Sequence, residues 1–217
     1  MNLALELMAT SVGKPAFLGE WQGEPVTSSI RKTPLSVSAI AVDNLNVFGD
    51  EQSDLTVHGG VDKAVYAYPA DHWPWWQSVA GFAPAIAGFG ENLTVKGATE
   101  DEIRIGDKFA WGDVELQVSQ PRAPCFKFVM LTARQDMAAR MTTSGRTGWY
   151  YRVLKMGTAP TAGSLTRIST DAAMPTVREA FIAMFQPRVD DAIVEKVLAT
   201  AALARQWRAG VRQRRRP

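Results

Sequence analysis

The chain has 217 residues, 46% hydrophobic and 21% charged, which is typical of one globular domain with a small appendage. Its one cysteine, Cys125, excludes an intramolecular disulfide and a zinc site built from several thiolates, and its two histidines disfavour a His-rich metal site. No run of 18 apolar residues and no signal-peptide pattern is evident, so we expect a cytoplasmic protein without a membrane span.

The net charge of +2 conceals a basic C-terminal end. Six arginines follow position 204 without any acidic residue, and without them 18 basic residues stand against 22 acidic ones. Such an end could bind nucleic acid or an anionic lipid surface. We favour a solvated helix end, where arginines lie near the negative end of the helix dipole, and therefore do not expect nucleic-acid binding.

Short strands separated by turn-forming residues are expected from residue 1 to about 170. The expected strands are 3–11, 36–42, 64–68, 92–95, 149–154 and 164–168, with a hairpin over 108–118 that turns at Gly112-Asp113. Two helices are expected, near 71–79 and from about 126 to 141. Frequent short strands with many glycines and prolines favour a closed or folded β-architecture over a parallel, doubly wound sheet.

After position 171 the pattern predicts three short amphipathic helices. Thr176 and Glu179 have the spacing of a capping box, and Gln186-Pro187 marks a break. Helices this short are not stable alone, so they should pack together or against the main domain. The predicted organisation is a main domain over 1–170 and a three-helix appendage with a basic tail over 171–217. The surplus of aromatic residues makes a homodimer plausible.

A polar, glycine-containing segment precedes the expected strand 64–68. Gly59 and Gly60 would let the backbone approach a ligand closely, and His58 and Lys63 could donate hydrogen bonds to an anionic oxygen. A tight turn with Asp62 and Lys63 paired on the surface is an equally good interpretation.

Two loops carry further candidates. In Gly-Phe-Gly-Glu-Asn-Leu, residues 88–93, Asn92 can both donate and accept hydrogen bonds, although Phe89 could merely fill the core. Near residue 30, Arg31 lies among hydroxyl groups and a second cation and could hold a phosphate, but a solvated loop is at least as good an interpretation. The aromatic residues at 149–151 are more typical of a core or an interface.

Cys125 follows Arg122 and Pro124 at the expected start of a helix. A cation and a helix start both favour the thiolate, which could act as a nucleophile, carry a persulfide or bind a soft metal. Arg122 has the planar donor geometry that suits phosphate. The alternative is a buried structural cysteine. Motifs of serine hydrolases, P-loop enzymes and dinucleotide-binding folds are absent, and nothing in the spacing supports a Cys-His hydrolase.

Together these segments resemble the MOSC family, which is named for the C-terminal domain of molybdenum cofactor sulfurases. The matching stretches are His-Gly-Gly-Val-Asp-Lys-Ala-Val at 58–65, Gly-Phe-Gly-Glu-Asn-Leu at 88–93 and Pro-Arg-Ala-Pro-Cys at 121–125. Ile-Arg-Lys-Thr-Pro at 30–34, Gly-Trp-Tyr-Tyr-Arg-Val at 148–153 and the three C-terminal helices resemble the YiiM-like branch. The resemblance covers almost the whole chain.

The resemblance implies a mainly β, barrel-like fold with flanking helices and an exposed cysteine. It also implies a molybdenum cofactor, in which molybdopterin carries a phosphate and the metal takes the thiolate of Cys125. The candidates for the cofactor pocket are Arg122, Lys63, His58, Asn92, Arg31, Gly59 and Gly60. Asp54 or Glu91 could supply a proton. Pyridoxal phosphate is not expected.

The function that the resemblance implies is reduction of N-hydroxylated bases, such as 6-hydroxylaminopurine, as a detoxification. Because the chain has no cysteine cluster for iron and sulfur and no flavin or nicotinamide motif, electrons must come from a separate donor protein. The alternative is a carrier that holds a persulfide or the cofactor on Cys125 without turnover.

Overall fold

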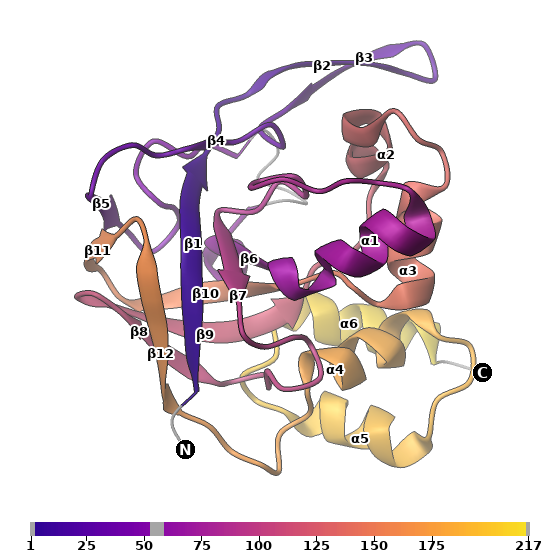
Figure 1. The fold of residues 1–217 in the computed structure, drawn as a ribbon. Helices are drawn as coiled ribbons and strands as arrows, with labels where there is room; N and C mark the ends of the chain where they lie inside the picture. The colour runs from indigo at the N-terminus through magenta and orange to yellow at the C-terminus, as the bar shows by residue number, and fades with distance from the viewer. Residues whose placement is uncertain (1–2, 53–58, 216–217) are drawn as a thin grey trace.

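The computed structural model describes residues 3–52 and 59–215. Within this part of the chain, seven strands close into a barrel (Figure 1). In spatial order they are β12 (Gly163–Ser169), β8 (Lys108–Trp111), β9 (Val114–Pro121), β10 (Trp149–Lys155), β6 (Val65–Pro69), β7 (Leu93–Lys96) and β1 (Ala4–Val12), and β1 pairs back with β12. Neighbouring strands are antiparallel except β6 and β7, which are parallel. The predicted mainly β, barrel-like fold is confirmed.

Smaller strand pairs extend from the barrel. The hairpin of β2 (Ala16–Trp21) and β3 (Glu24–Ser28) projects from one end, and β5 (Ala39–Val42) pairs with β11 (Gly157–Pro160) (Figure 1). A short β4 (Thr33–Pro34) adds to the end of β1. The sequence did not predict β2, β3 or β11. It did predict the hairpin of β8 and β9, whose turn contains Gly112 at φ 59°.

Three helices cover one side of the barrel. The 3-10 turns η1 (Val61–Lys63) and η2 (Ala70–His72) flank β6, and α1 (Trp73–Ala80) follows η2 directly. The single helix predicted over 126–141 is wrong: the structure has α2 (Phe126–Thr132) and α3 (Met137–Ser144). Ala133 ends α2 in the left-handed conformation, at φ 52°, and the Arg134 guanidinium donates to the Gly81 carbonyl at 3.2 Å, which holds the break against the end of α1.

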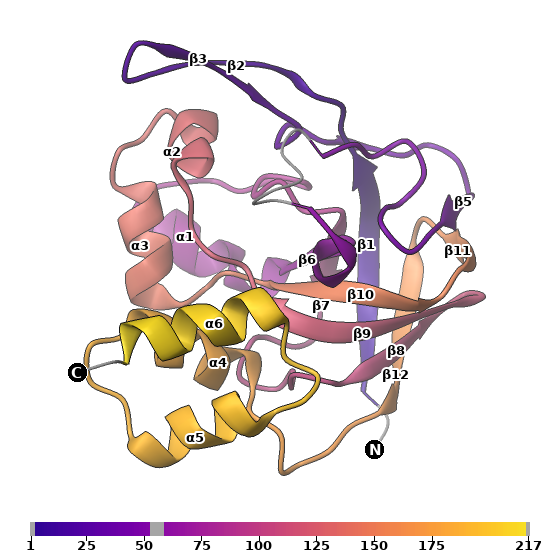
Figure 2. The same ribbon diagram turned by 180° about the vertical axis from the view of Figure 1, so that it is seen from behind.

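The three C-terminal helices are present as predicted: α4 (Val177–Phe185), α5 (Asp191–Ala199) and α6 (Arg205–Arg214) (Figure 2). Thr176 caps α4 through the expected reciprocal bonds with Glu179. Arg208 donates to the Leu203 carbonyl in the loop before α6, and Arg215 donates to the Ala183 carbonyl near the end of α4. Because the Arg214 guanidinium also lies over the Phe185 ring, at least three of the C-terminal arginines are engaged within the appendage.

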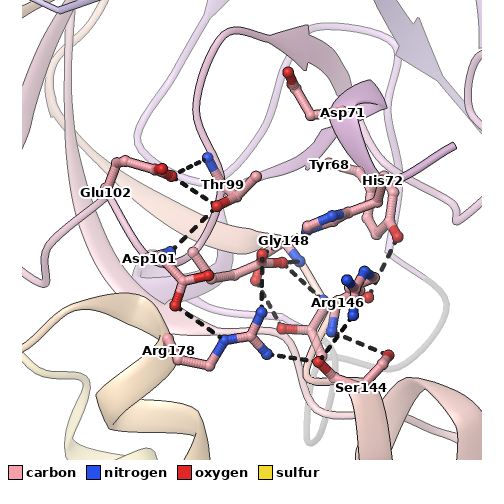
Figure 3. A network of polar contacts seen from close by, with 12 residues as sticks. Tyr68, Asp71, His72, Thr99, Asp101, Glu102, Ser144, Arg146, Gly148 and Arg178 are labelled. Carbon is pink, nitrogen blue, oxygen red and sulfur yellow. Dashed lines mark hydrogen bonds and ion pairs between the residues drawn. The ribbon is translucent and has the colours of Figure 1, made fainter. Parts of the chain in front are cut away.

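The appendage and the barrel share one hydrophobic core. Phe181, Val197 and Trp207 belong to the same buried cluster as Leu116 and Tyr151 of the barrel. At the surface, Arg178 of α4 joins this contact by donating to the Ser144 carbonyl at 2.7 Å and to Asp101 at 3.3 Å (Figure 3). The appendage is thus held by apolar packing and by a polar clamp.

A second buried cluster lies outside the barrel wall. Along β6, Val65 and Ala67 face the barrel interior, whereas Tyr66 and Tyr68 face the cluster that includes Trp76 and Phe128 of the covering helices. This alternation follows from the two-residue period of a strand. The interior of the barrel is filled by side chains, so the space available to a ligand lies outside its wall. None of the helices within 3–52 and 59–215 is long and apolar enough to cross a membrane.

Candidate functional site

A pocket lies on the outer face of the barrel, beside β6 and β10. The space in the pocket and above its open mouth is about 650 Å³. Tyr66 and Tyr150, which are directly opposite each other on β6 and β10, form part of its wall with their rings 5.1 Å apart. The next partner across the sheet is Gln120 of β9, opposite Tyr150.

Cys125 lines this pocket from the loop that leaves β9. Pro121 ends the strand, and Cys125 stands in an extended conformation, with φ −141°, immediately before α2. Its side chain is half-buried and forms no disulfide. The proline-containing loop therefore places the Cys125 thiol at a pocket, and Cys125 is not the buried structural cysteine that was the alternative interpretation.

Arg122 brings a buried cation to the same pocket. Its guanidinium lies 5.6 Å from the centre of the Tyr66 ring and 5.5 Å from that of Phe128, and donates to the sulfur of Met141. Within the described residues, no carboxylate pairs with it. Burial opposes the charge, but the neighbouring Tyr66 and Cys125 raise the pKa of Arg122, so the group stays cationic.

Lys32, Asp50 and Asn92 form a connected polar group in the pocket wall. Lys32 makes a nearly buried ion pair with Asp50, whose other oxygen accepts from the Asn92 amide at 2.9 Å. Burial lowers the pKa of Lys32, and the adjacent Asp50 partly opposes that shift. Asn92 also accepts from the backbone of Tyr66 at 3.1 Å, so it fixes the wall strand as well as facing the pocket.

One lining residue, Lys127, was not singled out in the sequence, whereas Ser29 belongs to the hydroxyl groups that were predicted near Arg31 as part of a phosphate site. Lys127, in the first turn of α2, is buried, and the structure pairs it with no acidic residue in the part of the chain it describes. Ser29 is buried as well, and its hydroxyl has no hydrogen-bond partner among the described residues. The described part of the lining contains four cations, Lys32, Lys63, Arg122 and Lys127, against the two acids Asp50 and Glu51. The pocket therefore favours an anionic ligand.

Lys63 reaches the pocket from the segment that precedes β6. Its ammonium group donates to Oε1 of Gln206 on α6 at 2.7 Å. Gly60, at φ 94°, occupies a backbone conformation that favours glycine and lies next to open space, and its carbonyl accepts from the Lys63 amide. Gly59 is next to it in the chain. Asp54 and His58 lie outside the described residues.

The structure does not bring Glu91 or Arg31 to the pocket lining. The Glu91 carboxylate is buried, accepts from the backbone of Phe89 at 2.9 Å and from the hydroxyl of Thr94 at 2.8 Å, and thus braces its own loop. Burial raises the pKa of Glu91 to about 6. Arg31 is exposed, and its neighbour Lys32 takes the place in the wall that was predicted for it.

The phenol of Tyr150 stays neutral at physiological pH. Burial raises its pKa to about 12, although the charge of Arg122 lowers it. A tyrosine in this state can donate a hydrogen bond to an oxygen in the pocket. In the part of the chain that the structure describes, no cluster of three or more His, Cys, Asp or Glu side chains could hold a metal ion. A metal at Cys125 would have to arrive with most of its own ligands.

Comparison with known proteins gives consistent matches. A family model described as the MOSC domain matches residues 54–171. The chain is 37% identical to YflK of Bacillus subtilis over 203 residues, covering 94% of this chain and 91% of YflK. It is 35% identical over 164 residues to a protein of Gibberella moniliformis named a reductase, covering 72% of this chain and 27% of that protein. The crystal structure of YiiM from Geobacillus stearothermophilus superposes with a TM-score of 0.79 at 28% identity, covering 97% of this chain and 98% of YiiM.

Proposed function

Because the chain belongs to the MOSC domain family, we propose that its cationic pocket holds a molybdenum cofactor and that the protein reduces N-hydroxylated compounds. The observation that carries this proposal is the meeting of the half-buried Cys125 thiol with Arg122 and Lys127, two cations that no acid pairs within 3–52 and 59–215, in one pocket. The reductase name of the Gibberella moniliformis relative supports a redox activity.

The donor set fits the cofactor. A thiolate is a ligand for a soft metal, and Cys125 is the pocket residue that can provide one. The phosphate of molybdopterin needs cations and hydrogen-bond donors, and the pocket offers Arg122 and Lys127 without acidic partners among the described residues. The hydroxyl of Ser29, which has no partner in the part of the chain that the structure describes, is a further donor. The bound molybdenum would supply two electrons by changing its oxidation state.

The reaction that we propose breaks the N–O bond of an N-hydroxylated base. Two electrons and two protons are consumed, and the corresponding amine and water leave. In this chain, Arg122 and Lys127 neutralise the anionic ligand, and the neutral Tyr150 hydroxyl donates a hydrogen bond to the departing oxygen. Asp54, outside the described residues, remains our candidate for delivering a proton. A separate protein delivers the electrons, and the cytoplasm is the compartment that we propose.

The function is tested by an assay that does not need the natural electron donor. Protein from cells competent in cofactor synthesis is mixed with reduced methyl viologen and an N-hydroxylated purine, and the amine product is quantified. We expect product from the wild type and from the surface control Lys155→Met, but none from Cys125→Ser. Equal turnover by Cys125→Ser would contradict the proposal. A molybdenum-loaded wild type without turnover, with one additional sulfur on Cys125 by mass, would favour the persulfide carrier.

A further inference from the structure

We propose that a second hollow, between the Cys125 loop and the C-terminal helices, binds the ring of a planar heteroaromatic substrate through the Gln120 amide. This inference rests on the proposed function and adds to it the place and chemistry of substrate recognition. The space in the hollow and above its open mouth is about 910 Å³. Figure 2 shows α6, which supplies part of it, with one end near the ends of β9 and β10.

The second hollow shares a wall with the cationic pocket. Lys63, Ala123, Cys125 and Tyr150 line both spaces. A substrate whose ring occupies the second hollow can therefore place its N-hydroxyl group beside Cys125 and Tyr150. The cationic pocket stays available to the anionic cofactor. This arrangement separates recognition of the substrate from retention of the cofactor.

The outer wall of the second hollow is apolar and aromatic. It is formed by Phe126 of α2, Met184 and Phe185 of α4 and Trp207 of α6. The indole nitrogen of Trp207 already donates to the Ala180 carbonyl at 3.1 Å, so this residue offers the hollow an apolar ring surface. Aromatic walls bind flat rings through stacking or edge contacts, whereas a small aliphatic substrate would leave most of this apolar surface exposed to water.

Gln120 supplies the polar contact that an apolar wall lacks. The side chain is 3% exposed and lines the hollow, yet its Oε1 has no hydrogen-bond partner among the described residues. The orientation of the amide is fixed because its Nε2 donates to the Pro121 carbonyl at 3.2 Å. A buried acceptor without a partner costs folding free energy, and a ligand that donates to Oε1 offsets this cost once a small shift of the neighbouring groups opens the atom, which has almost no exposed surface, to the hollow.

These features select one kind of substrate. The ring must be flat enough for the wall formed by Phe185 and Trp207, and it must carry an N–H that can reach Oε1 of Gln120. A heteroaromatic base with an exocyclic hydroxylamino group has both, and after reduction its amine product keeps them. Lys63 at the shared wall carries a positive charge, which disfavours cationic aliphatic amines.

The first test measures binding of adenine, as a product analogue, to purified protein of known cofactor content by equilibrium dialysis. Gln120→Met removes the acceptor while keeping a similar side-chain volume, and we expect the dissociation constant of adenine to rise roughly tenfold. The control Gln213→Met changes an exposed amide of α6 outside the hollow, and should leave the constant unchanged. Thermal unfolding should show Gln120→Met to be at least as stable as the wild type.

The second test fills the hollow. Met184→Trp should lower kcat/KM for an N-hydroxylated purine at least tenfold while leaving the reduction of acetohydroxamate, a small aliphatic substrate, within twofold. Adenine affinity unchanged in both Gln120→Met and Met184→Trp would overturn the subsite, even where the purine is reduced. A different result would overturn the proposed function but not the subsite: the cofactor-containing protein binds adenine as expected and reduces neither the purine nor acetohydroxamate.

Discussion

Lys63 donates to Oε1 of Gln206 over 2.7 Å, and this contact joins the glycine-containing segment before β6 to the first turn of α6. Both residues line the second hollow, and Lys63 also lines the cationic pocket. The C-terminal appendage therefore helps to place a cation at the candidate site, in addition to packing against the barrel.

The contact with Gln206 predicts that the appendage influences cofactor retention. Gln206→Ala should lower the molybdopterin content of purified protein about two- to fivefold, because the Lys63 ammonium loses one of the groups that orient it. Stability should change by less than about 0.5 kcal/mol, since the replaced residue is exposed. The measurement is pterin fluorescence after release, with Gln213→Ala as the matched control. Equal pterin content in both variants would contradict the inferred role.

We expect Arg122 to bind the cofactor and to contribute little to the stability of the fold. The guanidinium is buried, and no carboxylate pairs with it among the described residues, so Arg122→Met replaces a costly buried charge by an apolar side chain of similar length. We expect the free energy of unfolding in urea to stay within about 1 kcal/mol of the wild-type value or to rise. Pterin content should fall at least tenfold. A variant that unfolds readily, or one that retains its pterin, would contradict this account.

Glu91 should make the stability of the protein fall as the pH rises from 4.5 to 7. Burial raises the pKa of its carboxyl from 4.5 to about 6, so between these values the folded state holds the proton more tightly than the unfolded state. The contribution of Glu91 to stability is therefore full below pH 4.5 and falls as the pH rises through 6, by about 2 kcal/mol in all. Comparing urea unfolding at pH 4.5 and 7, Glu91→Gln should lack this decrease. A decrease of the same size in the variant would exclude Glu91 as its source.

We expect the hydrogen bonds of Arg178 to contribute measurably to the free energy that holds α4 against the barrel. Arg178→Ala removes the bonds to the Ser144 carbonyl and to Asp101 and should lower the free energy of unfolding by about 1–2 kcal/mol. Arg188→Ala, an exposed arginine between α4 and α5, is the control and should have almost no effect. Equal unfolding midpoints for the two variants would show that the apolar core alone holds the appendage.

Periodicity and turn chemistry made much of the fold predictable. The alternation on both sides of Gly112 located β8 and β9, and the spacing of Thr176 and Glu179 located the start of α4. The sequence did not predict the break after α2, because alanine is a good helix former. In the structure Ala133 has a left-handed conformation, and the next residue, Arg134, donates to the end of α1, a tertiary contact that local sequence does not reveal.

The sequence predicted the site residues whose types and neighbours are unusual. It did not predict those whose place in the site depends on tertiary packing. Cys125 and Arg122 were singled out because a thiol and a guanidinium flank prolines at a helix start. Arg31 and Lys32 are adjacent cations, and only the path of the backbone after β3 turns Lys32 inward. From its sequence position, Lys127 is expected to be an ordinary lysine on a helix surface. That Oε1 of Gln120 has no hydrogen-bond partner among the described residues depends on which groups surround it in space.

The measurement that tests the central claim most directly is the molybdenum and pterin content of wild type beside Cys125→Ser, both expressed in cells competent in molybdopterin synthesis. The account predicts molybdenum and pterin in near-equal amounts in the wild type and a loss of most of the molybdenum in Cys125→Ser, with the same thermal unfolding midpoint. A wild type without molybdenum, despite a loaded reference molybdoenzyme from the same cells, would contradict it. Full molybdenum content in Cys125→Ser would contradict the assignment of the thiolate as the metal ligand.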